Sequence, residues 1–255
     1  NKKDSRQEEA FKEYESFLQT MPLLKSMHDM HPNHIHEEIE LQAMDFSTYL
    51  PEWLAYVPEW RDYYLSHNQI NHYEYLRDVL KAMQFIQGPK KWILKSPQHL
   101  EQITPLLGTF PDATFAITYR DPLSVVLSTA TMLSYGDRVR RYKVEPKNNF
   151  NYWHNRIKTL LERFSKDYQL IPADQKCDVF FQDLIKDNLN SVRKIYSKNA
   201  FEIDKIANNE IKEYINANKR GKDGQVIYNL EDFNVDKSEF YKSFKFYFDK
   251  FDILK

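Results

Sequence analysis

The order of apolar runs along the sequence predicts an α/β fold, with a parallel sheet flanked by helices. Two short apolar runs, Trp92–Leu94 and Ala113–Thr118, enclose a segment with helical spacing, and a third, Asp178–Phe181, follows a long helical stretch. Strands that alternate with helices in this way are typical of parallel sheets covered on both faces. Hydrophobic residues make up 42% of the 255 residues, which suffices for a globular core.

We expect one domain over residues 1–255, with a mainly helical part over 1–90 and an α/β core with C-terminal helices over 91–255. In the helical part, Ser5 begins a capping-box pattern ahead of apolar residues at helical spacing. The clearest amphipathic pattern runs over Tyr73–Ile86, and a glycine followed by proline ends it.

Beyond residue 91 the predicted elements alternate between strand and helix. Helical patterns cover His99–Phe110, Pro122–Tyr135, Trp153–Phe164 and Leu184–Ile195. Pro122 suits the first turn of its helix, because the N–H that proline lacks is not needed there. The tail holds a basic loop, Asn218–Gly224, and closes with an aromatic-rich helix over Phe240–Phe251.

Composition excludes several classes of function. The formal net charge of −1 argues against non-specific attraction to nucleic acids or membranes, and we expect no nucleic-acid partner. No apolar run approaches the roughly 18 residues of a membrane span. The single Cys177 excludes an intrachain disulfide and fits a reducing compartment, so we expect a cytoplasmic protein. Because the chain begins with Asn1 and not with methionine, we expect it to be a fragment, with the start of the protein missing.

A cationic residue follows each of the first two predicted strands. Lys95 ends the first apolar run and Arg120 the second, and ligands of parallel sheets sit outside the carboxyl ends of the strands. A guanidinium can grip a phosphate through two parallel hydrogen bonds. Ser128 lies about two helical turns further on, where its hydroxyl could face the same ligand. We therefore expect one anionic ligand near these residues.

Simpler interpretations of the same residues stay open. Arg120 could pair with Asp121 or a neighbouring helix, and Ser128 could be an ordinary serine on a helix surface. Lys95 could mark only the point where a strand reaches water. The following serine and proline favour the functional interpretation, because they end the strand abruptly and fix the direction of the lysine.

Several short motifs lie around and beyond these cations: Lys95-Ser96-Pro97, His99-Leu100, Phe110–Ala113, Tyr119–Pro122 with Ser128, Phe180–Leu184, Arg220-Gly221 and Tyr228–Phe233. In this order and spacing they resemble the PAPS-dependent sulfotransferases, where PAPS is 3′-phosphoadenosine 5′-phosphosulfate. The nearest branch has LKSP-x-HL and T-x-R-D-P motifs and is distantly similar to tyrosylprotein sulfotransferases. The resemblance covers most of the chain from Lys91 onward, and it implies a P-loop-NTPase-like sheet.

The resemblance implies a role for individual residues. Arg120 and Ser128 match the pair that holds the 3′-phosphate of PAPS, and Lys95 matches a lysine that contacts the transferring sulfuryl group. A late loop is implied to close over the same phosphate region: Arg220, Gly221 and Lys222. The implied reaction is in-line transfer of the sulfuryl group, in which positioning and charge stabilisation dominate.

The sequence departs from the family pattern in two ways. The 5′-phosphosulfate loop, a "PRTGTT"-like turn between strand and helix, has no counterpart, so we expect the first strand and this loop to lie before Asn1. The acidic residue best suited to act as general base is expected there too. In addition, Tyr119 stands where histidine is usual and Gln182 where glutamate is usual.

Other polar residues are candidates for catalysis. His99, at a helix start beside the lysine turn, could be a general base or a substrate contact, or could make only a structural hydrogen bond. Of the acidic residues near His31–His36, we expect Glu38 to face the site. The histidines there do not follow H-E-x-x-H spacing, so we expect no metal. The aromatic segment Trp53–Tyr64 is interpreted as core packing, with an acceptor-pocket wall as the alternative.

The sequence therefore predicts a sulfotransferase that moves a sulfuryl group from PAPS to an acceptor hydroxyl or amine and releases the bisphosphate PAP. One alternative is a nucleotide or phosphoryl kinase of the same fold, which would need a G-x-x-x-x-G-K-[ST] loop. Another is a binding or scaffold protein that keeps the fold without catalysis. The acceptor and the oligomeric state stay undetermined.

Overall fold

The computed structural model describes residues 5–199 and 202–253, which form mostly helices and a parallel sheet. This confirms the predicted α/β class. Contacts within the chain group into two compact units, each drawn from separate stretches. The first unit holds the residues up to Ile35, Asp121–Asn155 and Ile203–Tyr241, and the second holds His36–Arg120, Arg156–Glu202 and the residues from Lys242.

The sheet of the second unit has two parallel strands in the described residues. Strand β1 (Phe115–Tyr119) pairs with β2 (Lys176–Phe180), with Phe115 opposite Lys176 and Tyr119 opposite Phe180. Alternate side chains of each strand are buried, as the period of two requires. The predicted strands Ala113–Thr118 and Asp178–Phe181 are therefore confirmed, although the boundaries of each differ from the prediction by up to about two residues.

The predicted strand Trp92–Leu94 is wrong. Its backbone joins no ladder, because β1 and β2 pair only with each other in the part of the chain that is described. The side chains of the segment nevertheless alternate as they would in a strand. Trp92 and Leu94 lie against a buried cluster, whereas Ile93 between them is 82% exposed. An apolar run can thus alternate between core and solvent without a strand to pair with.

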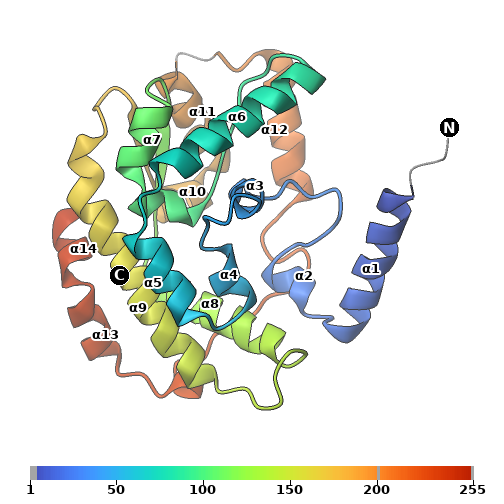
Figure 1. Cartoon of the computed structure of the whole chain (residues 1–255), viewed down its shortest axis with the longest axis vertical. Coiled ribbons are helices and arrows are strands. Elements are labelled where there is room, and N and C mark those ends of the chain that lie inside the picture. Colours follow the sequence, from blue (N-terminus) through green and yellow to red (C-terminus); the bar gives the residue numbers. More distant parts are fainter. Residues whose placement is uncertain (1–4, 200–201, 254–255) are drawn as a thin grey trace. The chain divides into compact units, whose positions relative to one another are not determined.

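Helices make up most of the second unit. Figure 1 labels them: α3 (Ile39–Ala43), α4 (Leu50–Leu54), α5 (Pro58–Ser66), α6 (Ile70–Gln87), α7 (Ile103–Thr109), the later part of α9 (Pro146–Asp167), α10 (Phe181–Lys186), α11 (Asn188–Lys198) and α14 (Lys245–Lys250). The unit also holds the 3₁₀ turns η1 (Pro97–Glu101) and η2 (Tyr168–Leu170). Tyr73 and Leu76 of α6 are fully buried and pack with Leu106 of α7. Helix α6 ends at Gly88, whose φ of 86° favours glycine.

Two helices expected to be continuous are each divided in the structure. The predicted helix His99–Phe110 is a 3₁₀ turn, η1, followed by α7, with the break at Gln102. The predicted helix Leu184–Ile195 is α10 followed by α11, because the Asp187 side chain accepts a hydrogen bond from the Asn190 N–H at 2.9 Å and starts a new helix. Apolar spacing continues across both breaks, so it does not reveal them.

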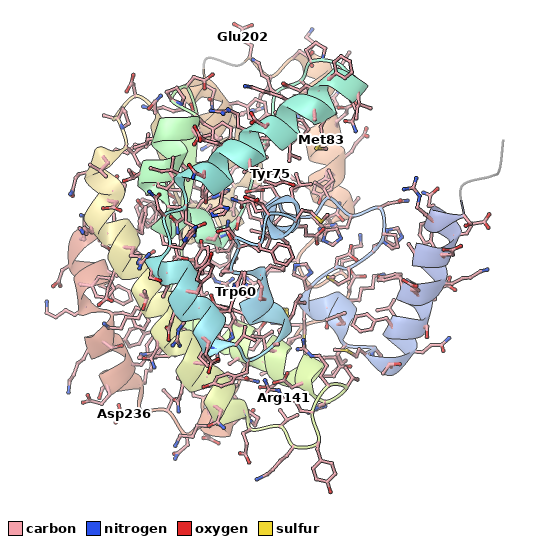
Figure 2. All side chains as sticks on the ribbon, in the orientation of Figure 1. Trp60, Tyr75, Met83, Arg141, Glu202 and Asp236 are labelled. Carbon is pink, nitrogen blue, oxygen red and sulfur yellow. The ribbon has the colours of Figure 1, made fainter. Side chains whose placement is uncertain are left out.

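The aromatic segment after α4 is partly core and partly surface. Tyr64 is 1% exposed, whereas Tyr56 is 58% exposed. Trp60, labelled on α5 in Figure 2, donates its indole N–H to the Thr48 carbonyl at 2.9 Å. The core interpretation therefore holds for Tyr64, whereas Tyr56 lies at the surface.

The first unit holds helices α1 (Arg6–Thr20), α2 (Leu24–Met27), α8 (Pro122–Asp137), the start of α9, α12 (Lys205–Ala217), the turn η3 (Glu231–Phe233) and most of α13 (Lys237–Ser243). Asp121 caps α8 by accepting the Leu123 N–H at 3.1 Å, and Pro122 takes the first turn as predicted. Tyr241 also donates its hydroxyl to Asp121, at 3.3 Å. These bonds fix where α8 begins.

A fully buried ion triad ties three elements of the second unit together. Arg156 of α9 donates from Nε to the Glu52 carboxylate of α4 at 3.0 Å, and from both terminal nitrogens to Glu101 of η1 at 2.8 and 2.5 Å. All three side chains are 1% exposed or less. Burial alone would lower the pKa of Arg156, but the two carboxylates hold it above its ordinary value. The triad thereby anchors η1.

Candidate functional site

Lys95 stands at the junction between the extended segment and η1. Ser96 caps the turn by accepting the Gln98 N–H at 3.3 Å, and proline follows it. The ammonium of Lys95 contacts the carboxylate of Glu37, and the lysine side chain is 74% exposed. Its backbone N–H donates to Glu38 Oε2 at 2.8 Å. The lysine is thus fixed at its backbone while its charged end reaches solvent.

Glu38 lies at the start of α3 and is buried. One carboxylate oxygen accepts the Lys95 N–H, and the other is hydrogen-bonded to His99 Nε2. Burial is the largest influence on the pKa of Glu38 and alone would raise it, but the hydrogen bond and charge of His99, together with backbone N–H groups that include that of Lys95, hold it below its ordinary value of 4.5. Glu38 is therefore a carboxylate stabilised in its charged form.

His99 uses both ring nitrogens inside the protein. An ionised carboxylate can only accept, so Nε2 donates to Glu38. The hydroxyl of Tyr73, a fully buried residue of α6, lies 2.8 Å from Nδ1 and is hydrogen-bonded to it. A chain of hydrogen bonds therefore runs from Glu38 through His99 to Tyr73. The structure brings together the three residues that the sequence predicted for catalysis, Lys95, His99 and Glu38.

The second predicted ligand-binding cation, Arg120, directly follows β1 in the second unit. Its guanidinium carbon lies 4.4 Å from the centre of the Phe181 ring, at the start of α10. This cation–π contact places the guanidinium against the face of the ring. A guanidinium is a type of group that recognises oxyanions.

The remaining residues predicted to bind the donor belong to the first unit. Ser128 lies on α8, with its hydroxyl 3.0 Å from that of Tyr228. The late loop follows α12 as an exposed turn that contains Arg220, Gly221 and Lys222. Gly221 has a φ of 80°, so any side chain there would be strained. That these residues and Arg120 hold one phosphate stays a prediction.

Sequence reasoning missed two partners in this region. It did not foresee that Glu37 contacts the ammonium of Lys95, or that Tyr73 completes the hydrogen-bond chain through His99. Tyr73 follows the helical period of α6 like a core residue, and only its hydroxyl is functional in this chain of bonds. Glu37 had no signal besides its position next to Glu38.

The histidines near residue 31 make separate local contacts. His31 accepts the Asn33 N–H at Nδ1 and packs on the edge of Phe11. His36 lies 3.9 Å from Glu40. Across residues 5–199 and 202–253, no group of three or more histidine, cysteine, aspartate and glutamate side chains is arranged to hold a metal ion. The same residues contain no helix with the length and apolarity to cross a membrane.

Replacing Glu38 with glutamine is expected to lower the free energy of unfolding by about 1.5–3 kcal/mol at neutral pH, the contribution of a hydrogen bond to a charged group. A carboxyl group with a lowered folded-state pKa stabilises the protein above its unfolded-state pKa, and this stability disappears as the pH falls through the folded-state value. The difference between wild type and Glu38→Gln should therefore shrink below pH 4.5 in urea titrations. The exposed Glu40→Gln serves as control, and a difference that widens in acid would contradict this account.

The sequence and the structure are similar to those of known proteins. A model of the sulfotransferase family matches residues 1–204. Among solved structures, sulfotransferase STF9 from Mycobacterium avium matches with a TM-score of 0.81 and 17% identity over 98% of this chain and 65% of its own. Sulfotransferase STF1 from Mycobacterium tuberculosis H37Rv matches with a TM-score of 0.71 and 20% identity over 93% of this chain and 64% of its own. The chain thus spans about two thirds of these relatives. A search of curated proteins found no significant match.

Proposed function

We propose, from the premise that this chain belongs to the sulfotransferase family, that its protein moves a sulfuryl group from PAPS to an acceptor hydroxyl or amine. The observation that carries the proposal is Lys95, a lysine fixed by its backbone to a buried carboxylate while its ammonium stays exposed. An ammonium placed in this way can stabilise charge on a transferring group without reacting itself.

Glu38 and His99 support Lys95 in this proposal. Glu38 accepts the Lys95 N–H with one oxygen and holds the His99 ring with the other, and His99 is itself fixed by Tyr73. Because these bonds lie in a buried region, they restrict the position of the lysine backbone before any substrate binds. The predicted catalytic set therefore divides into one charged group at the surface and two residues that position it.

PAPS supplies an activated sulfate, and this chain supplies residues that fit its phosphates. Arg120 has a guanidinium that lies over the Phe181 ring, and a guanidinium can make two parallel hydrogen bonds to the 3′-phosphate. Ser128 offers a hydroxyl close to that of Tyr228. The exposed late loop adds a backbone turn and two cations to the proposed phosphate contacts: Arg220, Gly221 and Lys222.

Arg120→Ala is expected to weaken binding of adenosine 3′,5′-bisphosphate by about 10- to 100-fold, because it removes hydrogen bonds between charged groups. Isothermal titration calorimetry on the full-length protein measures this change. Arg77→Ala on α6, where the arginine pairs with Glu74 and Asp78, is the matched control and should leave the affinity unchanged.

Equal affinity of wild type and Arg120→Ala would remove Arg120 from the phosphate site. A full-length protein that binds no bisphosphate would contradict PAPS as donor and favour the scaffold interpretation. Binding that requires Mg²⁺ and prefers a nucleoside triphosphate would instead favour the kinase.

A further inference from the structure

A general base must present an accessible lone pair to the proton that it removes. Glu38 and His99 do not meet this requirement. The Glu38 side chain is 4% exposed and engages one oxygen with His99 and the other with the Lys95 N–H. His99 donates from one nitrogen to Glu38, and its other nitrogen is hydrogen-bonded to the Tyr73 hydroxyl. The chain of bonds therefore leads inward, away from any acceptor.

Glu37 meets the requirement. Its side chain is partly exposed, and one carboxylate oxygen contacts the ammonium of Lys95. Within the described part of the chain, its side chain makes no other hydrogen bond or ion pair, so the second oxygen keeps its lone pairs for a ligand. Glu37 and Glu38 are consecutive residues, yet one carboxylate is turned into the core and the other toward solvent.

We infer that Glu37, in place of the acidic residue expected before Asn1, is the general base for the acceptor, and that Lys95 restrains it until the donor binds; this inference rests on the proposed function. The charge contact places the base next to the cation assigned to the sulfuryl group. An exposed ion pair of this kind is weak, so an anionic sulfuryl group can replace Glu37 as the partner of Lys95 at little cost.

The step balances without a further reactant. The acceptor O–H bond breaks and its proton passes to a Glu37 oxygen, while a bond forms between the acceptor oxygen and sulfur. The bond from sulfur to the bridging oxygen of the donor breaks, and its electron pair leaves with the phosphate of the bisphosphate product. Lys95 stabilises the negative charge that develops on the transferring group. Glu37 then returns its proton to water.

The test compares Glu37→Gln and Glu37→Ala with wild type in the full-length protein, with PAPS as donor and phenol as probe acceptor. Release of sulfate to water is followed in the same reactions. Loss of a general base lowers the rate about 10²- to 10⁴-fold. Binding of adenosine 3′,5′-bisphosphate should stay within about 2-fold of wild type, because the base does not contact the nucleotide. Glu40→Gln, three residues along on α3, is the control.

Two further readouts separate a base from a residue that only orients Lys95. Added formate or acetate should restore activity to Glu37→Ala, the stronger base acetate more effectively, because a small carboxylate can occupy the space of the side chain. With 4-nitrophenol at a pH where it is already ionised, Glu37→Gln should lose little activity. A purely orienting residue would show neither effect.

Each outcome has a definite meaning. Glu37→Gln within about 3-fold of wild type, or carboxylates that give no rescue, would overturn the inference while wild-type sulfuryl transfer upholds the proposed function. A wild-type protein that binds no bisphosphate and transfers no sulfuryl group would overturn the proposed function itself. A wild type that binds the bisphosphate but transfers to neither phenol nor water would contradict a base that is already in place.

Discussion

Replacing Arg156 with alanine is expected to lower the free energy of unfolding by about 3–5 kcal/mol. The change leaves the carboxylates of Glu52 and Glu101 in the core without their cation, and both side chains are fully buried. Uncompensated buried charge costs far more than the packing lost with the arginine side chain. Urea unfolding at neutral pH, followed by circular dichroism, measures the difference.

Lys158→Ala on the same helix is the matched control. Lys158 forms an exposed pair with Glu162 one turn away, and such pairs contribute about 0.3–0.5 kcal/mol. The deficit of Arg156→Ala should also shrink as the pH is lowered, because protonation removes the buried negative charges. A deficit below about 1 kcal/mol at neutral pH would show that the triad is not what anchors η1.

Local sequence signals predicted those elements whose cause is local. Helix α6 follows from its apolar spacing and from the glycine at its end, and α8 follows from Asp121 as cap and Pro122 in the first turn. Strands β1 and β2 were visible as short apolar runs. In each case the pattern that predicts the element is also the one that buries it.

The errors arise where the cause lies in another part of the chain. Trp92–Leu94 has the composition of a strand, but a strand exists only with a hydrogen-bonded neighbour, and no spacing within three residues can supply one. Likewise, the apolar period runs across Gln102 and Asp187, where backbone capping ends one element and starts the next. Periodicity reports the buried face and not the continuity of the helix.

The candidate site likewise has features that the sequence predicted and features that depend on distant parts of the chain. Motif resemblance singled out Lys95 and His99, and the acidic cluster near His31–His36 suggested Glu38, although 57 residues separate Lys95 from Glu38 and 61 separate His99 from it. Resemblance did not predict which of two consecutive carboxylates turns inward. Tertiary packing decides that, because Glu38 finds the Lys95 N–H and His99 in the core while Glu37 finds only the lysine ammonium. The expected orientation of Glu38 toward the acceptor thus differs from its buried position in the structure.

Lys95→Ala is expected to lower the rate of sulfuryl transfer at saturating donor by about 10²- to 10³-fold, the effect of removing one group aimed at charge that develops in the transition state. The reason lies in the geometry of Lys95. Its backbone is fixed by Glu38, so the ammonium works from a set position, and its exposure lets a donor reach it. Rates with PAPS and phenol, measured for the full-length protein, give the change.

Lys91→Ala, an exposed lysine four residues earlier in the same segment, is the control and should keep full activity. The variants at Lys95 and Arg120 should behave in opposite ways. Adenosine 3′,5′-bisphosphate lacks the sulfuryl group, so Lys95→Ala should bind it like wild type, whereas Arg120→Ala should bind it weakly. A Lys95→Ala protein that loses bisphosphate affinity as Arg120→Ala does would place Lys95 on a phosphate and not on the transferring group. The rate and the affinity together therefore assign each cation to one end of the donor.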